Sequence, residues 1–97
     1  MVIVYLLKLN DFGKKHADSR KSLSTWKDLV LKAQWRTRQD VLRDFPRAKM
    51  IKNNRARFEI VHNTYHLIAH IHYGEQFTEI RFIGTHTEYD RIDPGTI

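Results

Sequence analysis

The chain lacks cysteine and long hydrophobic runs. The absence of cysteine among its 97 residues excludes a disulfide framework and any metal site built on thiolates. It also fits a reducing compartment such as the cytoplasm. No apolar run approaches the roughly 20 residues that a membrane-spanning helix needs. The apolar opening, residues 2–7, follows no basic region and precedes no small-residue cleavage site, so we expect a strand there and no secretory signal.

Acidic residues are also few relative to basic ones. Eleven aspartates and glutamates face 17 lysines and arginines, which gives a formal charge of +6. A small basic chain commonly binds a polyanion, most often nucleic acid. Five cations lie in one stretch that contains no acid: Arg47, Lys49, Lys52, Arg55 and Arg57. A solvated basic surface without a ligand is the alternative interpretation.

The amino-terminal half predicts one strand and two or three helices. Residues 2–6 favour a strand, and residues 7–16 favour a helix that Gly13 weakens. Asp18 or Ser19 is a suitable N-cap for the next helix. The apolar stripe of that helix recurs at three- and four-residue steps, which also predicts that its tryptophan is a core residue: Leu23, Trp26, Leu29, Val30 and Ala33.

A third, short helix is predicted after residue 37. Thr37 and Asp40 match a capping box, and Pro46 stops the apolar stretch that follows. Residues 47–52 then lead back to the sheet, and Asn53 and Asn54 form a turn.

Three strands are predicted at residues 55–62, 65–73 and 77–83, joined by short loops. Gly74 in the second loop is expected to supply a positive φ. Alternation assigns one face to the core: Ala56, Phe58, Ile60, Tyr65, Leu67, Ala69, Ile71, Thr78, Ile80 and Phe82. The other face is open to a partner: Arg55, Arg57, Glu59, His66, His70, His72, Phe77, Glu79 and Arg81.

These elements predict a single domain of the α+β class. Its strand and helices would pack on one face of a mostly antiparallel sheet that ends in a three-strand meander, giving two layers. A chain of this length buries enough surface for one modest core. No repeat, low-complexity segment or interdomain linker interrupts it.

The open face combines anion-binding and proton-transfer groups. Arginine binds phosphate bidentately, histidine titrates near neutrality, and tyrosine donates a proton or holds a phosphate oxygen. These are the groups needed to cleave RNA without a metal, by attack of the ribose 2′-OH on the adjacent phosphorus. The candidates are Arg55, Arg57, His66, His70, His72, Arg81, His86 and Tyr89, with Lys52, Lys49 and Arg47 as further RNA-binding cations.

A metal site is the competing interpretation of the histidines. His66 and His70 are four residues apart on a strand, or roughly 13 Å, which is too far to share an ion. His70 and His72 are roughly 6.6 Å apart and close enough to share one. No acidic or cysteine residue has a recognisable ligand spacing to them. We therefore expect no metal and interpret both as exposed strand positions.

His86 and Tyr89 follow the last strand and are three residues apart. If this segment forms a helical turn, both side chains lie on one side of it, beside the rim of the basic face. The pattern is equally compatible with Tyr89 packing its ring and His86 capping a terminus.

The sequence resembles the HigB toxins, mRNA interferases of bacterial type II toxin–antitoxin systems that are related to the RelE toxins. The resemblance covers most of the chain, and the Thr-His-x-Glu-Tyr-Asp tail is its most specific part. It rests on residues 54–60, 63–68 and 80–90, on Trp26, Trp35 and Val41, and on the Asp44-Phe45-Pro46 stop.

The resemblance implies a RelE-like fold and metal-free mRNA cleavage, often on the translating ribosome. It also implies inhibition by an antitoxin, commonly a HigA-type helix-turn-helix protein. His86 and Tyr89 match the family's proton-transfer positions, and Arg57 matches a basic strand position. The family's usual Tyr-Arg-Leu is here Tyr65-His66-Leu67. Either His66 shares the acid–base work, or Arg81 or Arg55 supplies the missing charge.

Two other functions compete with RNA cleavage. A non-catalytic RNA- or ribosome-binding module needs the basic patch but not His86 and Tyr89, and its RNA binding would be salt-sensitive. A protein-interaction domain whose basic face meets an acidic partner would have no affinity for RNA.

Overall fold

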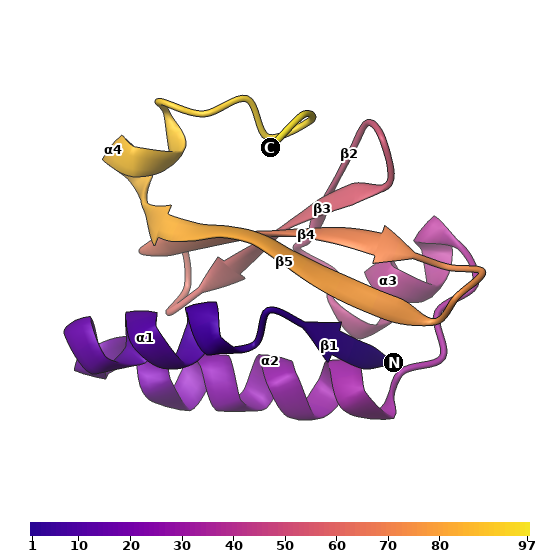
Figure 1. Cartoon of the computed structure of the whole chain (residues 1–97), viewed down its shortest axis with the longest axis horizontal. Coiled ribbons are helices and arrows are strands. Elements are labelled where there is room, and N and C mark those ends of the chain that lie inside the picture. The colour runs from indigo at the N-terminus through magenta and orange to yellow at the C-terminus, as the bar shows by residue number, and fades with distance from the viewer.

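The computed structural model describes all residues, 1–97. A five-stranded mixed sheet in the order β1-β5-β4-β3-β2 confirms the predicted α+β class (Figure 1). The elements along the chain are β1 (Val2–Val4), α1 (Leu7–Lys15), the 3₁₀ turn η1 (Ala17–Ser19), α2 (Arg20–Lys32), α3 (Arg38–Asp44), β2 (Lys49–Ile51), β3 (Arg55–Ile60), β4 (Tyr65–His72), β5 (Phe77–Thr85) and α4 (His86–Tyr89).

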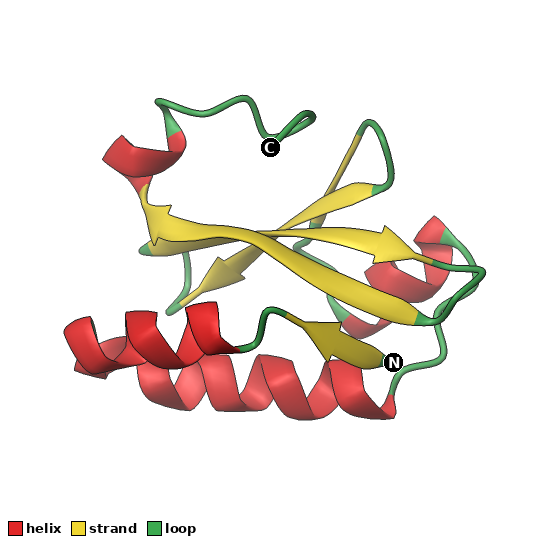
Figure 2. Cartoon of the chain, in the orientation of Figure 1, coloured by secondary structure: helices red, strands yellow, loops and turns green.

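The two layers lie as the sequence predicts. Figure 2 shows α1 and α2 side by side beneath the sheet, while α4 and the carboxy-terminal segment lie on its other side. Val41 of α3 joins the same buried cluster as the core-facing residues of β3 and β4, so α3 also packs on the helical face. We call the opposite face, which α4 covers at one end, the α4 face.

Strand pairing confirms the meander and adds an edge strand. β3, β4 and β5 pair antiparallel, while β1 pairs parallel to β5. β2 pairs antiparallel to β3 and was not predicted as a strand. Because β2 has three residues, it is too short to show an alternating pattern, and only its pairing with β3 identifies it.

Aromatic side chains form the centre of the core. Phe58 on β3 lies 5.4 Å from Trp26 on α2, 6.3 Å from Trp35 and 4.9 Å from Phe45, measured between ring centroids. Both tryptophans are buried, which confirms Trp26 as a core residue. Leu29 was predicted to lie in the core stripe of α2 but is 39% exposed. It lies about 100° around the helix from the buried Val30, so it falls at the edge of the buried stripe.

A bulge in β5 reverses one predicted side-chain direction. Ala69 pairs with Ile80 and Ile68 pairs with Phe82, so Arg81 is the extra residue in β5. Beyond a bulge the alternation changes phase. Ile83 therefore packs against the core, and Phe82, which was predicted to face the core, lies on the α4 face with its ring 6.4 Å from that of Tyr89.

The loop between β4 and β5 does not use its glycine as predicted. No glycine in the chain has a positive φ, and Gln76 has a φ of 61° instead. The Gln76 side-chain amide donates hydrogen bonds of 2.7 Å to the carbonyl oxygens of Trp35 and Tyr73. These two bonds hold a backbone conformation that a non-glycine residue rarely adopts.

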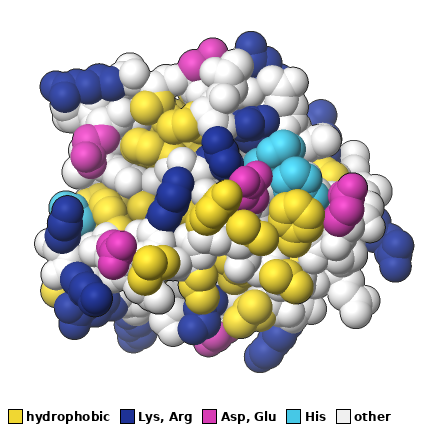
Figure 3. All heavy atoms as spheres, in the orientation of Figure 1, with side chains coloured by type: hydrophobic (Ala, Val, Ile, Leu, Met, Phe, Trp, Pro, Cys, Tyr) yellow, Lys and Arg dark blue, Asp and Glu magenta, His cyan; other side chains and the backbone are white.

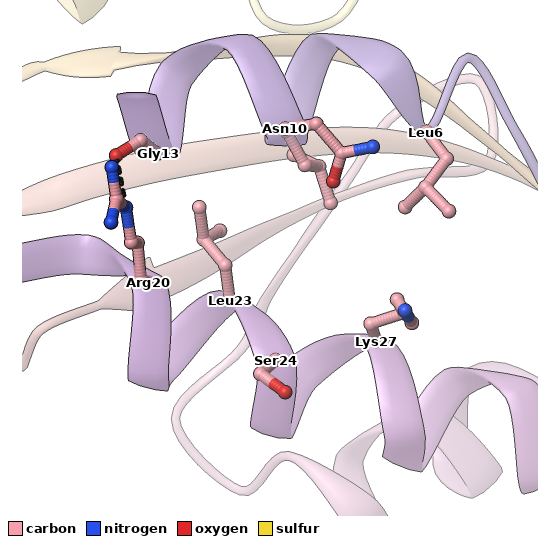
Figure 4. A pocket seen from close by; sticks show the side chains of 8 residues that line it. Leu6, Asn10, Gly13, Arg20, Leu23, Ser24 and Lys27 are labelled. Carbon is pink, nitrogen blue, oxygen red and sulfur yellow. Dashed lines mark hydrogen bonds between the residues drawn. The ribbon is translucent and has the colours of Figure 1, made fainter. Parts of the chain in front are cut away.

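A hollow of about 270 Å³ lies between α1 and α2 (Figure 4). Gly13 is buried here, and Arg20 Nε donates a 2.8 Å hydrogen bond to its carbonyl oxygen. A Cβ at Gly13 would lie 3.3 Å from the Arg20 side chain, so the glycine permits this close approach. The hollow lies in the helical layer, away from the α4 face.

No helix has the length and apolar character needed to cross a membrane.

Candidate active site on the α4 face

Cross-strand rows bring the predicted site residues onto one face. Lys49, Arg57, Ile68 and Phe82 are successive partners across β2, β3, β4 and β5. A neighbouring row pairs Arg55 with His70 and His70 with Glu79, and His66 pairs with Gly84. Opposed residues in a sheet project to the same side, so the predicted grouping of arginines and histidines is confirmed.

Helix α4 positions His86 and Tyr89, and it forms the helical turn that the sequence pattern had left open. Thr85 Oγ1 accepts a hydrogen bond from Glu88 N, while the Thr85 backbone N–H donates to Glu88 Oε1. The backbone bond from Thr85 lowers the pKa of the Glu88 carboxyl, as expected for a capping carboxylate. A Cβ at Gly84 would lie 2.7 Å from the Phe82 ring and 3.0 Å from Glu88, so the glycine lets α4 fold back over the sheet.

A pair of histidines from β4 and α4 forms the centre of the site. His66 Nε2 lies 3.0 Å from His86 Nδ1, and the ring centroids are 4.1 Å apart. His86 Nε2 forms a short hydrogen bond with the backbone oxygen of Asn63. A carbonyl oxygen only accepts, so His86 Nε2 carries a hydrogen. In the neutral pair His66 Nε2–H then donates to His86 Nδ1, which leaves His66 Nδ1 as a buried atom without a partner.

The surroundings of His66 favour its neutral form. The side chain is 1% exposed, and burial lowers its pKa, helped by the neighbouring His86 and Arg57. His86 is exposed. The pair therefore joins a neutral buried ring to a second ring that solvent reaches.

Arg57 and Tyr89 complete the site. The Arg57 guanidinium lies 5.7 Å from the centroid of the Tyr89 ring, which in turn is 4.7 Å from that of His66. Arg57 forms no ion pair, and its buried Nε has no hydrogen-bonding partner. Arg81, by contrast, donates to Glu79 Oε2 at 3.0 Å. Of these two arginines, Arg57 is the one whose charge no acid neutralises.

The carboxy-terminal segment covers part of the face that was predicted to be open. Arg55 Nη2 and Arg81 Nε donate to the Ile97 backbone oxygen at 2.7 and 3.2 Å. Asn53 Nδ2 donates to Gly95 O at 2.7 Å, and a Cβ at Gly95 would clash with the Lys52 stem. Strand alternation identifies a face but does not reveal a distant segment that returns over it.

The remaining predicted cations lie apart from the histidine pair. Lys49 is exposed beside Arg57, and Arg47 is exposed on the loop before β2. In the view of Figure 3 lysine and arginine side chains are spread over the molecule and form no continuous patch. The structure thus brings together Arg57, His66, His86 and Tyr89, and separately gathers Arg55, Arg81 and Lys52 around the carboxy-terminal segment.

Some residues that make contacts on the α4 face were not identified from the sequence. Thr85 and Glu88 match the T-x-x-E capping box, a signal that was available. The Asn63 carbonyl had no signal, because any residue supplies a backbone oxygen. Glu79 beside the β4 histidines was missed because its place depends on the register of β4 against β5.

Comparison with protein-family models gives a match that covers most of the chain. The HigB toxin family model, described as the RelE-like toxic component of a toxin–antitoxin system, matches residues 19–92. The match spans β2 to β5 and α4, and therefore all the residues of the histidine pair and its neighbours. No curated protein matches the chain.

Proposed function

The chain belongs to the HigB toxin family, and on that premise we propose that this toxin is a metal-independent endoribonuclease that cleaves mRNA. The observation that carries the proposal is the 3.0 Å contact between His66 Nε2 and His86 Nδ1, with Tyr89 and Arg57 beside it. A surface histidine in contact with a buried neutral one, next to a cation that no acid neutralises, suits proton transfer at a phosphodiester.

His86 is the general base in this mechanism. The 2′-OH of the ribose replaces the Asn63 oxygen at His86 Nε2, and the pair adopts its other tautomer. His86 Nδ1–H then donates to His66 Nε2. His86 Nε2 takes the 2′-OH proton while the 2′-oxygen bonds to phosphorus, and His66 stabilises the imidazolium by accepting from Nδ1–H. His66 is thus a positioning residue.

Tyr89 and Arg57 act on the phosphate. As the bond from phosphorus to the 5′-oxygen breaks, the Tyr89 hydroxyl donates its proton to that oxygen. The Arg57 guanidinium stabilises the doubly charged phosphorane. The products are a 2′,3′-cyclic phosphate and a 5′-hydroxyl. Arg57 supplies the charge that the family's usual strand arginine would give at position 66, because Arg81 and Arg55 already have partners.

The partners follow from the family. A toxin of a toxin–antitoxin system has an antitoxin partner. We propose that the antitoxin is of the HigA type with a helix-turn-helix domain, and that the substrate is mRNA on translating ribosomes in the cytoplasm. The chain would act as a single RelE-like domain. Lys49, Lys52 and Arg47 would bind RNA phosphates around the site.

Cleavage products test the proposal directly. We expect purified protein to cut mRNA on translating ribosomes and to leave 5′-hydroxyl and 2′,3′-cyclic phosphate ends. Protein treated with excess EDTA should cleave at the same rate as untreated protein. Both are assayed on ribosomes in a buffer that keeps the magnesium the ribosomes need. Products with 5′-phosphate ends would contradict 2′-OH attack. Salt-sensitive RNA binding without scission would support the binding module instead.

The histidine pair predicts a loss of cleavage at acidic pH. A general base must be unprotonated, and the pair gains a proton on the acidic side. A histidine cannot act as a base once it is protonated, so activity should hold down to about pH 6.5 and fall below it. The measurement is kcat/KM for a short RNA between pH 5 and 8. A flat profile would indicate that Tyr89 and Arg57 suffice.

Stability must be followed over the same range as a control. The unfolded chain binds a proton at His66 near its ordinary pKa, whereas the folded chain binds it at a lower pH. The free energy of unfolding therefore falls as the pH drops from about 6.5 through the lowered value. Circular dichroism at each pH separates this loss of stability from the loss of proton transfer.

A further inference from the structure

A second cluster of titratable side chains lies outside the histidine pair. His72 Nε2 is 3.3 Å and His70 Nδ1 is 3.7 Å from Glu79 Oε1. One ligand atom from each residue lies within 4.8 Å of the others. The view in Figure 3 includes a patch of histidine side chains with acidic and basic groups beside it. We call His70, His72 and Glu79 the β4–β5 cluster.

The hairpin of β4 and β5 builds this cluster. His70 and His72 are two residues apart and therefore project from the same face of β4. The register places Glu79 directly opposite His70. The His72 ring stacks on Phe77 and lies beside His70, with both centroid distances 4.0 Å. These contacts fix the ring directions and supply the acidic partner that sequence spacing did not reveal.

Glu79 is held by one oxygen and leaves the other toward the histidines. Arg81 Nη1 donates to Oε2 at 3.0 Å, while Oε1 faces both imidazoles. A carboxylate that ligates a metal is commonly held through its second oxygen by a neighbouring donor. The three side chains are about a quarter exposed or less, at 25%, 25% and 18%, so solvent reaches the cluster.

We propose that His70, His72 and Glu79 form a binding site for a divalent transition metal ion of the zinc class. A tetrahedral ion with bonds of about 2.1 Å places its ligand atoms about 3.4 Å apart. The two histidine-to-carboxylate separations, 3.3 and 3.7 Å, already bracket that value. Two imidazoles and one carboxylate favour Zn²⁺, Co²⁺, Ni²⁺ or Cu²⁺ over Mg²⁺ and Ca²⁺, which prefer oxygen ligands. Water fills the remaining position.

The site is separate from the histidine pair. His66 and His70 lie four residues apart on β4, roughly 13 Å, so one ion does not contact both groups. The cleavage mechanism takes no step through this ion, and the metal site does not rest on RNA cleavage.

Two arginine side chains lie beside the β4–β5 cluster, since Arg81 contacts Glu79 and Arg55 pairs with His70 in the register. They oppose a dication, which limits its affinity.

The test is a titration of the metal-free full chain, without an affinity tag, with Co²⁺ as the probe. Visible absorption should saturate at one equivalent, and Zn²⁺ should displace the Co²⁺. Glu79→Gln and His72→Gln should each weaken binding by more than about 100-fold. His62→Asn is the matched control, because His62 is exposed on a turn with a φ of 57°, which asparagine tolerates. It should bind as the parent does.

Several outcomes would overturn the proposal. These are the absence of saturable binding, an affinity that does not change in Glu79→Gln and His72→Gln, or equal weakening in His62→Asn. Thermal unfolding in EDTA checks that each variant folds, and His70→Gln replaces any variant that does not. Cleavage is assayed on the same samples with and without metal. Cleavage that persists where metal binding fails leaves the nuclease proposal standing.

Discussion

Replacing His86 by alanine is expected to lower the rate of mRNA cleavage by about 10²–10⁴-fold, the contribution of one positioned proton-transfer group. His86 is exposed, and its ring bonds connect to His66 and to the Asn63 backbone. The substitution removes the base without opening the core. Tyr89→Phe should give a loss of similar size, because it deletes the hydroxyl and keeps the ring that contacts His66 and Arg57.

The measurement is single-turnover cleavage of an mRNA on translating ribosomes. Single-turnover rates separate the chemical step from product release. His62→Asn again provides the matched histidine control and should cleave at the parent rate. RNA binding at low salt should be nearly unchanged in His86→Ala. Parent-level cleavage by both His86→Ala and Tyr89→Phe would remove these residues from the mechanism.

Truncating Phe58 to alanine is expected to lower the free energy of unfolding by about 3–5 kcal/mol. The side chain is 1% exposed and lies between three aromatic rings, those of Trp26, Trp35 and Phe45. Its loss leaves a cavity that helices on one side and the sheet on the other close only in part. Domains of this size are stable by about 5–15 kcal/mol, so this one change removes a large share.

Urea unfolding followed by tryptophan fluorescence measures this loss. Both tryptophans lie within 6.3 Å of the Phe58 ring centroid, so their emission reports on the same part of the core. Leu7→Ala is the surface control, since Leu7 is 66% exposed, and it should change stability by less than about 0.5 kcal/mol. A Phe58→Ala midpoint equal to that of Leu7→Ala would show that the aromatic cluster does not support the fold.

Local pattern determined much of this structure. The capping box at Thr37 and Asp40 begins α3 as predicted, because it depends on residues three apart in the chain. The alternation of β3 correctly assigns Phe58 to the core and Arg57 to the opposite face, since strand geometry fixes those directions without reference to other strands.

Most of the candidate site was predicted residue by residue but not as an arrangement. His66, His86, Tyr89 and Arg57 were all candidates, yet their contacts depend on β4 against β5 and on α4 folding back. The family resemblance indicated the same residues, whereas composition alone indicated only an anion-binding surface. The pairing of Arg81 with Glu79, which leaves Arg57 as the charge beside the histidines, needed coordinates.

The sequence by itself therefore determined the class of fold, the start of α3, the core side of β3 and β4, and the residue types available for chemistry. Only the tertiary structure decided the bulge at Arg81, which turns Phe82 and Gly84 toward α4, and the position of the carboxy-terminal segment over Arg55. The reason is the range of the interactions involved. Caps and alternation act within a few residues, whereas strand register and chain return are chosen by packing between segments that are distant in sequence.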